Sequence, residues 1–190
     1  MTKKICALLT ALLVLGCLSA ICFAGPATFD SAGKYKEVLL DKKANFTVKQ
    51  DDEKIVFRAD NSGYLHLDGK KSGEDYLSFI PNDKNNVADK YMIRELKATY
   101  PKMALYEIAA VVGDNNVGYW IVGKMKGQWK CFISYEDLYN MGMSAGAAHK
   151  LSSTIENGRL VLRTTSDGNP DAAVELVWND SEKSFELNNH

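Results

Sequence analysis

Apolar and polar residues alternate with a period of two along much of the chain, as in half-buried β-strands. Three such stretches, 54–59, 64–68 and 76–80, are separated by Asp60-Asn61-Ser62-Gly63 and by a glycine-bounded turn at 69–73. We predict a three-stranded antiparallel meander from this pattern. A second set, at 104–112, 119–125 and 128–134, is joined by turns at 113–118 and 126–127 and predicts a second meander on the same plan.

The two predicted meanders, 54–80 and 104–134, also share short sequences in the same order. Asp60-Asn61, Gly63-Tyr64, Gly69-Lys70 and Phe79-Ile80 correspond to Asp114-Asn115, Gly118-Tyr119, Gly123-Lys124 and Phe132-Ile133. We interpret this as an internal duplication. Independent use of common turn residues is the alternative, because two copies are few for a repeat architecture.

The last third of the chain predicts two more hairpins. Strands at 149–156 and 159–165 flank Asn157-Gly158, which accepts the positive φ angles of a type I′ turn. Strands at 172–178 and 184–188 form the other hairpin, and alternation places Val174, Leu176 and Trp178 on its inward face.

Two segments have helical spacing. From 86 to 100 the apolar residues Val87, Tyr91, Met92, Leu96 and Tyr100 recur, Asn86 is suited to a cap, and Pro101 would end the helix. The segment 136–143 predicts a short helix with Leu138 and Met141 packing inward. Between 35 and 50 the pattern is ambiguous: 36–43 is either a helical turn or an edge strand, and 46–49 is more strand-like.

These elements predict an α+β fold that is mostly antiparallel β, with one amphipathic helix packed on meander sheets. The chain has 190 residues, 46% apolar and 25% charged, which suits one globular domain. We assign residues 25–190 to this single β-rich domain, preceded by an export signal.

Residues 1–24 have the pattern of a secretory signal peptide. Lys3 and Lys4 precede an apolar stretch from 5 to 23, and Cys22 and Ala24 supply small residues for cleavage before Gly25. Cleavage after Ala24 predicts a periplasmic or secreted protein. Two alternatives stay open: the apolar stretch is long enough for a membrane anchor, and Val14-Leu15-Gly16-Cys17 predicts lipidation at Cys17.

Charge argues against nucleic acid as a partner. The chain carries a net charge of −1, and removal of the two leader lysines leaves 21 basic against 24 acidic residues. Such a surface lacks the excess of positive charge that attracts phosphate backbones or anionic membranes. We therefore expect no nucleic acid and no stable membrane insertion after cleavage.

Only Cys131 remains once the leader is removed. It follows Trp129 by two residues and precedes Ile133 by two, which places all three on one strand face. The sequence predicts a buried, unreactive Cys131, with a reactive thiol or an intermolecular disulfide as the alternatives.

Catalytic and cofactor motifs are missing from the sequence. The three histidines are far apart, and there is no P-loop or dinucleotide fingerprint, so we predict no metal, no cofactor and no catalytic residue. The nearest approach to a nucleophile and its base is Ser144 with His149, in a loop that is otherwise a flexible connection.

Binding is the function that the sequence favours. Tyr64, His66 and Asp68 alternate along one strand face, which is either a ligand-contacting strip or a solvated surface. Tyr119 and Trp120 offer aromatic contact area beside it, or pack in the core. We predict an exported, non-enzymatic module that binds a protein or a cell-envelope ligand. An exported hydrolase using Ser144 and His149, or a structural component of a surface assembly, are the alternatives.

Overall fold

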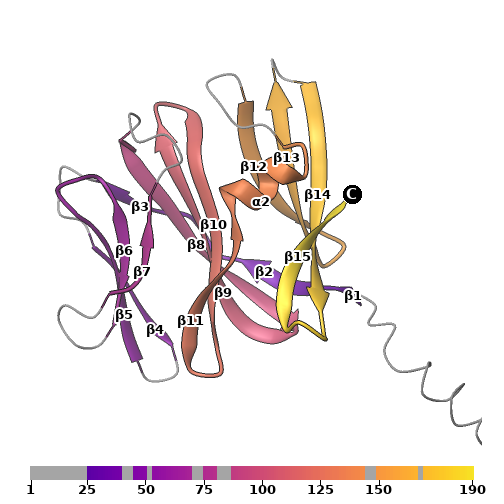
Figure 1. Cartoon of the computed structure of the whole chain (residues 1–190), viewed down its shortest axis with the longest axis horizontal. Coiled ribbons are helices and arrows are strands. Elements are labelled where there is room, and N and C mark those ends of the chain that lie inside the picture. The colour runs from indigo at the N-terminus through magenta and orange to yellow at the C-terminus, as the bar shows by residue number, and fades with distance from the viewer. Residues whose placement is uncertain are drawn as a thin grey trace, which may run out of the picture.

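The computed structural model describes residues 25–39, 45–50, 53–69, 75–80, 87–143, 149–166 and 169–190. Within these residues the chain forms three antiparallel sheets and one short α-helix, which confirms the predicted fold class. The sheets lie side by side as three layers, with the largest sheet in the middle (Figure 1).

The central sheet contains six strands. Its order is β11 (Gln128–Ser134), β10 (Asn115–Met125), β9 (Lys102–Val112) and β8 (Lys90–Tyr100), with β2 (Thr28–Ala32) and β3 (Lys36–Leu39) both pairing with β8. The first outer sheet is β4 (Asn45–Gln50), β5 (Glu53–Ala59), β6 (Leu65–Asp68) and β7 (Asp75–Phe79).

The second outer sheet covers the opposite face of the central sheet (Figure 1). It contains β12 (His149–Glu156), β13 (Arg159–Ser166), β14 (Asn169–Asn179), β15 (Ser184–Asn189) and the two-residue β1 (Gly25–Pro26), which pairs with β14. Strand β12 is an edge strand of this sheet.

The central strands bury both of their faces. Along β9, Leu105 and Ala109 pack in the core shared with the second outer sheet, whereas Tyr106, Ile108 and Ala110 pack in the core shared with the first. We call these the second core and the first core. Covering both faces makes the strand apolar at nearly every position, as in strands buried within a layered protein.

The predicted helix at 86–100 is wrong: residues 90–100 are strand β8, and residues 81–86 lie outside the described residues. Tyr91 and Ile93 face the first core, and Met92 and Leu96 face the second. Both faces of this strand carry apolar residues. Taken together, apolar residues from the two faces recur at intervals of four or five, which imitates the spacing of a helix.

The short helix predicted at 136–143 is confirmed as α2 (Tyr135–Asn140). Ser134 caps it in a capping box with Asp137, which satisfies backbone N–H groups of the first turn. Leu138 is buried in the second core and Met141 packs against it, so α2 is the helix that lies on the sheets.

Both meanders and both carboxyl-terminal hairpins are confirmed. Asn157 and Gly158 have φ angles of 51° and 78°, as a type I′ turn requires. The turn expected at 113–118 is wrong in length, because strand β10 already begins at Asn115. In the ambiguous segment, 36–39 is the edge-strand alternative, and the proposed duplication stays a prediction.

The predicted burial of Cys131 is wrong. A β-bulge shifts the register between β10 and β11, so that Ile121 pairs with Ile133 but the next residue, Val122, pairs with Cys131. Trp129 therefore packs in the first core and Ile133 in the second, while Cys131 is an exposed residue. Its thiol is partly covered, donates to the Ile133 carbonyl at 3.3 Å, and has a pKa that burial raises to about 11. No helix among the described residues has the length and apolar character needed to cross a membrane.

Candidate functional site

One carboxylate is completely buried in the second core. Glu107 is on β9 with 0% of its surface exposed, directly opposite Arg94 on β8, whose side chain is 10% exposed. The Arg94 Nε donates to Glu107 Oε2. A buried carboxylate requires such a partner, because the desolvation of an unpaired charge costs several kcal/mol.

Three hydroxyl groups complete the environment of Glu107. The Tyr35 hydroxyl donates to Oε2 at 3.0 Å, the Tyr119 hydroxyl donates to Oε1 at 2.7 Å, and Ser153 Oγ also donates to Oε1. With Arg94, these are four donors on one carboxylate, which matches its four acceptor sites. We call these five residues the buried network.

The buried network ties the central sheet to the edge strand β12. Arg94 Nη2 donates to the Ser153 carbonyl oxygen at 3.1 Å and to Ser153 Oγ at 2.7 Å. The guanidinium also lies 4.5 Å from the centroid of the Tyr35 ring, in a cation–π contact. Tyr35 thus covers the ion pair from the solvent side while remaining 39% exposed.

The protonation states of the network follow from its charges. Burial, the largest single effect, would lower the pKa of Arg94, but the charge of Glu107 and the hydrogen bond to it, with smaller contributions from Tyr35 and Tyr119, together raise the pKa. Burial, followed by the charge of Glu107, raises the pKa of the Tyr35 and Tyr119 phenols well above the usual value. At neutral pH the network therefore holds one positive guanidinium and two neutral phenols.

A cavity of about 340 Å³ opens beside this network, which we call the edge pocket. Tyr35, Ser152 and Ser153 line one side. The apolar side chains that line it are Met92, Ala109, Val111 and Leu151, and the polar residues are Lys90, Asp114 and Asn116, with Gly113 at the β9–β10 turn. Its volume falls in the range of small-ligand sites.

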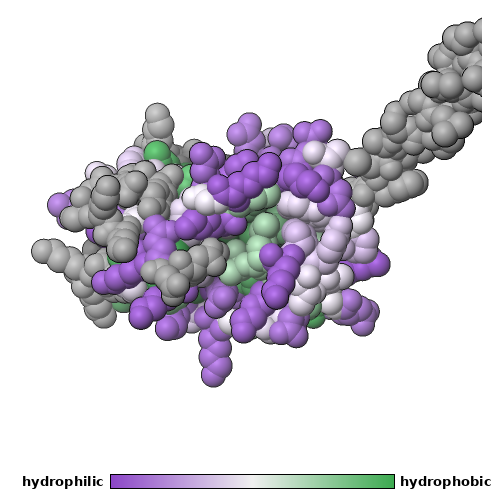
Figure 2. Space-filling view, turned by 90° about the horizontal axis from the view of Figure 1, so that it is seen from below, coloured by the Kyte–Doolittle hydropathy of each residue, from purple (hydrophilic) through white to green (hydrophobic). Residues whose placement is uncertain are grey.

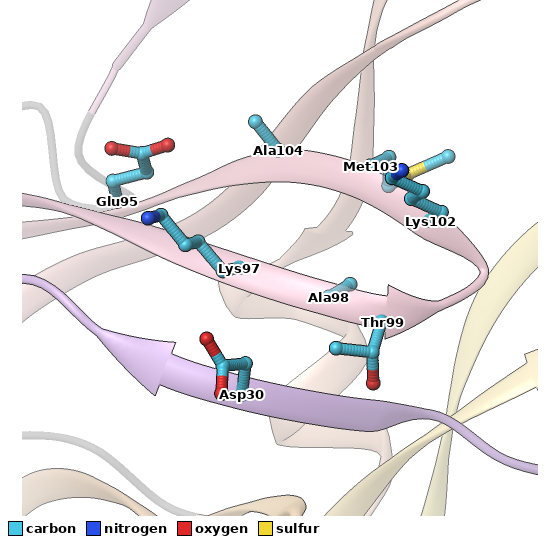
Figure 3. A pocket seen from close by; sticks show the side chains of 8 residues that line it. All are labelled: Asp30, Glu95, Lys97, Ala98, Thr99, Lys102, Met103 and Ala104. Atoms are coloured by element: carbon cyan, nitrogen blue, oxygen red, sulfur yellow. The ribbon is translucent and has the colours of Figure 1, made fainter.

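A second cavity, of about 480 Å³, lies on the β8–β9 hairpin. Seven of its lining residues come from this hairpin, and Asp30 comes from β2 (Figure 3). Asp30 and Glu95 balance Lys97 and Lys102 in charge, so the hollow has no net preference for a charged ligand. Seen from below, the molecule shows light green, moderately hydrophobic residues between purple hydrophilic ones (Figure 2).

The structure does not bring the five predicted ligand residues together. Tyr64, His66 and Asp68 are half-buried, with His66 and Asp68 on the outer face of the first outer sheet. Tyr119 is buried in the second core, and Trp120 is buried in the first core, where its ring contacts Phe79 at 5.4 Å between centroids. Trp120 therefore meets the inner face of the first outer sheet, whereas Tyr119 faces the second outer sheet.

His66 and Asp68 of the predicted strip form hydrogen bonds with neighbouring residues of the first outer sheet and its turn. His66 Nε2 lies 2.8 Å from Asp60 Oδ2, and His66 Nδ1 lies 3.1 Å from Ser78 Oγ. Burial would raise the pKa of Asp60, but its hydrogen bonds with His66 and with the backbone N–H groups of Tyr64 and Ser62 lower it. Asp68 accepts from Arg58 Nε at 2.7 Å.

Of the pair proposed for hydrolysis, Ser144 lies outside the described residues, and His149 is the first residue of β12. The described residues contain no group of three or more His, Cys, Asp or Glu side chains placed to hold a metal ion. Sequence reasoning missed the buried network. Its visible signal was Glu107, a lone acid in the apolar stretch from 105 to 112.

These features define a three-layer antiparallel β-protein with a pocket against an edge strand. No family model matches the chain, and no curated protein and no solved structure matches it.

Proposed function

We propose that this protein is an exported, non-enzymatic module that binds a protein or a cell-envelope ligand. The observation that carries the proposal is the buried network behind the edge pocket. Tyr35 and Ser153 line the pocket and are both held by Glu107. A wall fixed by hydrogen bonds is preorganised, which lowers the entropic cost of ligand binding.

The same network argues against acid–base catalysis at this pocket. A general base needs a free lone pair within reach of its substrate. The four hydrogen bonds that Glu107 accepts occupy its oxygens, and Arg94 balances its charge. Glu107 and Arg94 are therefore arranged to fix the wall of the edge pocket.

Export rests on the leader-like sequence of residues 1–24. Cleavage after Ala24 would leave Gly25 as the new terminus, and Gly25 is the first residue of β1, opposite Trp178. The proposed cleavage site is thus compatible with an intact second outer sheet. The alternatives of an anchor or a lipid at Cys17 keep the same domain at a membrane surface.

The test is site-specific photo-crosslinking in the exporting host. Ser152 is exposed and lines the edge pocket, so we replace it with p-benzoylphenylalanine. Ser181, in the exposed turn between β14 and β15, is the matched control. We expect an adduct of defined mass from position 152 that position 181 does not give.

Identical adducts from both positions, or none from 152, would overturn the proposal. Adducts between two copies of this chain would instead support the structural-component alternative.

A second candidate function is hydrolysis, favoured by the contacts of His66. Ser78 and Asp60 on opposite ring nitrogens give the order of groups in a serine nucleophile, base and acid relay. A fluorophosphonate probe separates the two candidates. A binding module stays unlabelled, whereas labelling that is lost in Ser78→Ala and in His66→Gln, with folding retained, would establish a hydrolase.

A further inference from the structure

The edge pocket runs beside backbone groups of β12 that point away from its own sheet. Glu156 and Arg159 flank the two-residue turn and form the hydrogen-bonded pair that closes the hairpin. Alternation then directs the backbone N–H and C=O of residues 155, 153, 151 and 149 toward the open edge.

The contact with Arg94 is consistent with this orientation. Its Nη2 donates to the backbone carbonyl of Ser153, so this group does point to the open edge, toward the central sheet. Arg94 thereby occupies the edge at Ser153. The N–H and C=O of Leu151, two residues earlier on β12, lie at the same edge beside the pocket, because Leu151 lines it.

The chemistry around Leu151 specifies a ligand. Met92, Ala109 and Val111 offer an apolar surface for one side chain. The charge of Lys90 is already balanced, because its Nζ donates to Glu37 at 3.1 Å. Asp89 accepts from the Gly113 N–H at 2.7 Å, a neutral donor that leaves its negative charge in place. Asp114 is exposed and has no ion-pair partner among the described residues, so it complements a cation.

We propose that the edge pocket binds an extended peptide segment that pairs with β12 at Leu151. One apolar side chain of the segment packs on Met92 and Val111, and a basic side chain lies against Asp114. Strand addition of this kind takes its affinity from main-chain hydrogen bonds and its specificity from the side chains that enter the adjoining pocket. This inference rests on the proposed binding function and names the chemical class of its ligand.

The test is selection from a display library of random heptapeptides. The exported protein, its Asp114→Lys variant and the control variant Glu182→Lys are each used as the target. Glu182 is an exposed acid in the β14–β15 turn. We expect the unaltered protein and Glu182→Lys to enrich peptides with alternating apolar residues and a lysine or arginine. Asp114→Lys should bind these peptides at least about fivefold more weakly and select acidic residues at that position.

Backbone methylation of the best peptide tests the pairing itself. Only every second N–H of an added strand faces β12. Methylating that alternate set should weaken binding by about tenfold or more, while methylating the other set should leave it nearly unchanged.

Three outcomes would overturn the inference: no enriched peptide, enrichment that Asp114→Lys does not alter, or equal effects of the two methylation patterns. The crosslinking at Ser152 keeps the two proposals apart. An adduct at Ser152 without peptide binding removes the peptide inference alone, whereas the loss of both removes the binding function too.

Discussion

The two cores on either side of the central sheet share apolar packing but differ in their buried polar groups. The first core is apolar and aromatic, with stacked or tilted ring pairs such as Phe46–Phe57 and Phe57–Tyr106. The second core contains a buried ion pair and three hydroxyl groups. Apolar packing tolerates small shifts between sheets, whereas a carboxylate with four donors accepts one register. We infer that the second core fixes the position of β12, and with it the edge pocket.

Removing the carboxylate should produce the largest effect. Glu107→Ala leaves Arg94 buried without its counter-charge, and we expect a loss of about 4 kcal/mol in the free energy of unfolding, measured by urea denaturation. The double variant Glu107→Leu/Arg94→Met should be less destabilised than Glu107→Ala, because it removes both charges together. A double variant that is no more stable than Glu107→Ala would contradict the assignment of this cost to an unpaired charge.

Ile108, the next residue on β9, gives the corresponding loss of unfolding free energy for the first core. Ile108 has 0% of its surface exposed, and Ile108→Ala should cost about 3 kcal/mol through lost burial and the cavity left behind. The loss is measured in the same series of urea denaturations. Crosslinking from position 152 should be unchanged in this variant, since Ile108 faces away from β12. Loss of the adduct in folded Ile108→Ala would argue against separate roles for the two cores.

Two buried tyrosines allow a hydrogen bond to a charged acceptor to be compared with one to a neutral acceptor. Tyr119 donates to Glu107 at 2.7 Å in the second core, and Tyr91 donates to the Gly63 carbonyl at 2.8 Å beside the first core. We expect Tyr119→Phe to cost about 2 kcal/mol and Tyr91→Phe about 1 kcal/mol, since hydrogen bonds to charged groups are the stronger. Thermal unfolding of both variants, side by side, measures the difference. Equal costs would show that the charge of Glu107 adds nothing to the bond.

The smallest expected effect is the response to alkaline pH. Burial raises the pKa of Tyr35, so its neutral form is favoured in the folded state. Stability from this residue is present below the usual pKa of about 10 and is lost as the pH rises beyond it. Urea midpoints measured from about pH 9 to 11 should therefore fall, and Tyr35→Phe should reduce the slope. An unchanged slope would mean that Tyr35 ionises without disturbing the network.

Strands of the first outer sheet could be predicted from the sequence where one face is solvated. In β6, buried Leu65 and Leu67 alternate with half-buried His66 and Asp68, which is the pattern that the sequence displays. Strand β8 could not be read in the same way. Its residues alternate between two cores, so the polar face that distinguishes a strand from a helix is missing.

The candidate site was even less accessible to sequence reasoning. Arg94, Glu107 and Tyr119 lie on neighbouring strands of the central sheet, but Ser153 joins them only because β12 packs across that sheet. Tyr119 was singled out as aromatic contact area for a ligand, with core packing as the alternative, and in the structure it is a buried hydrogen-bond donor to Glu107. The spacing of residues along a chain does not encode how one sheet crosses another.

The bulge in β11 has a consequence for how the layers come apart. Trp129 before it belongs to the first core, and Ile133 after it belongs to the second. If either outer sheet detaches, one half of β11 becomes exposed while the other half of β11 is still packed against the remaining sheet. The three layers should melt together in a single cooperative transition, and a dye on the Cys131 thiol, placed at the crossover point, would report the loss of both at once.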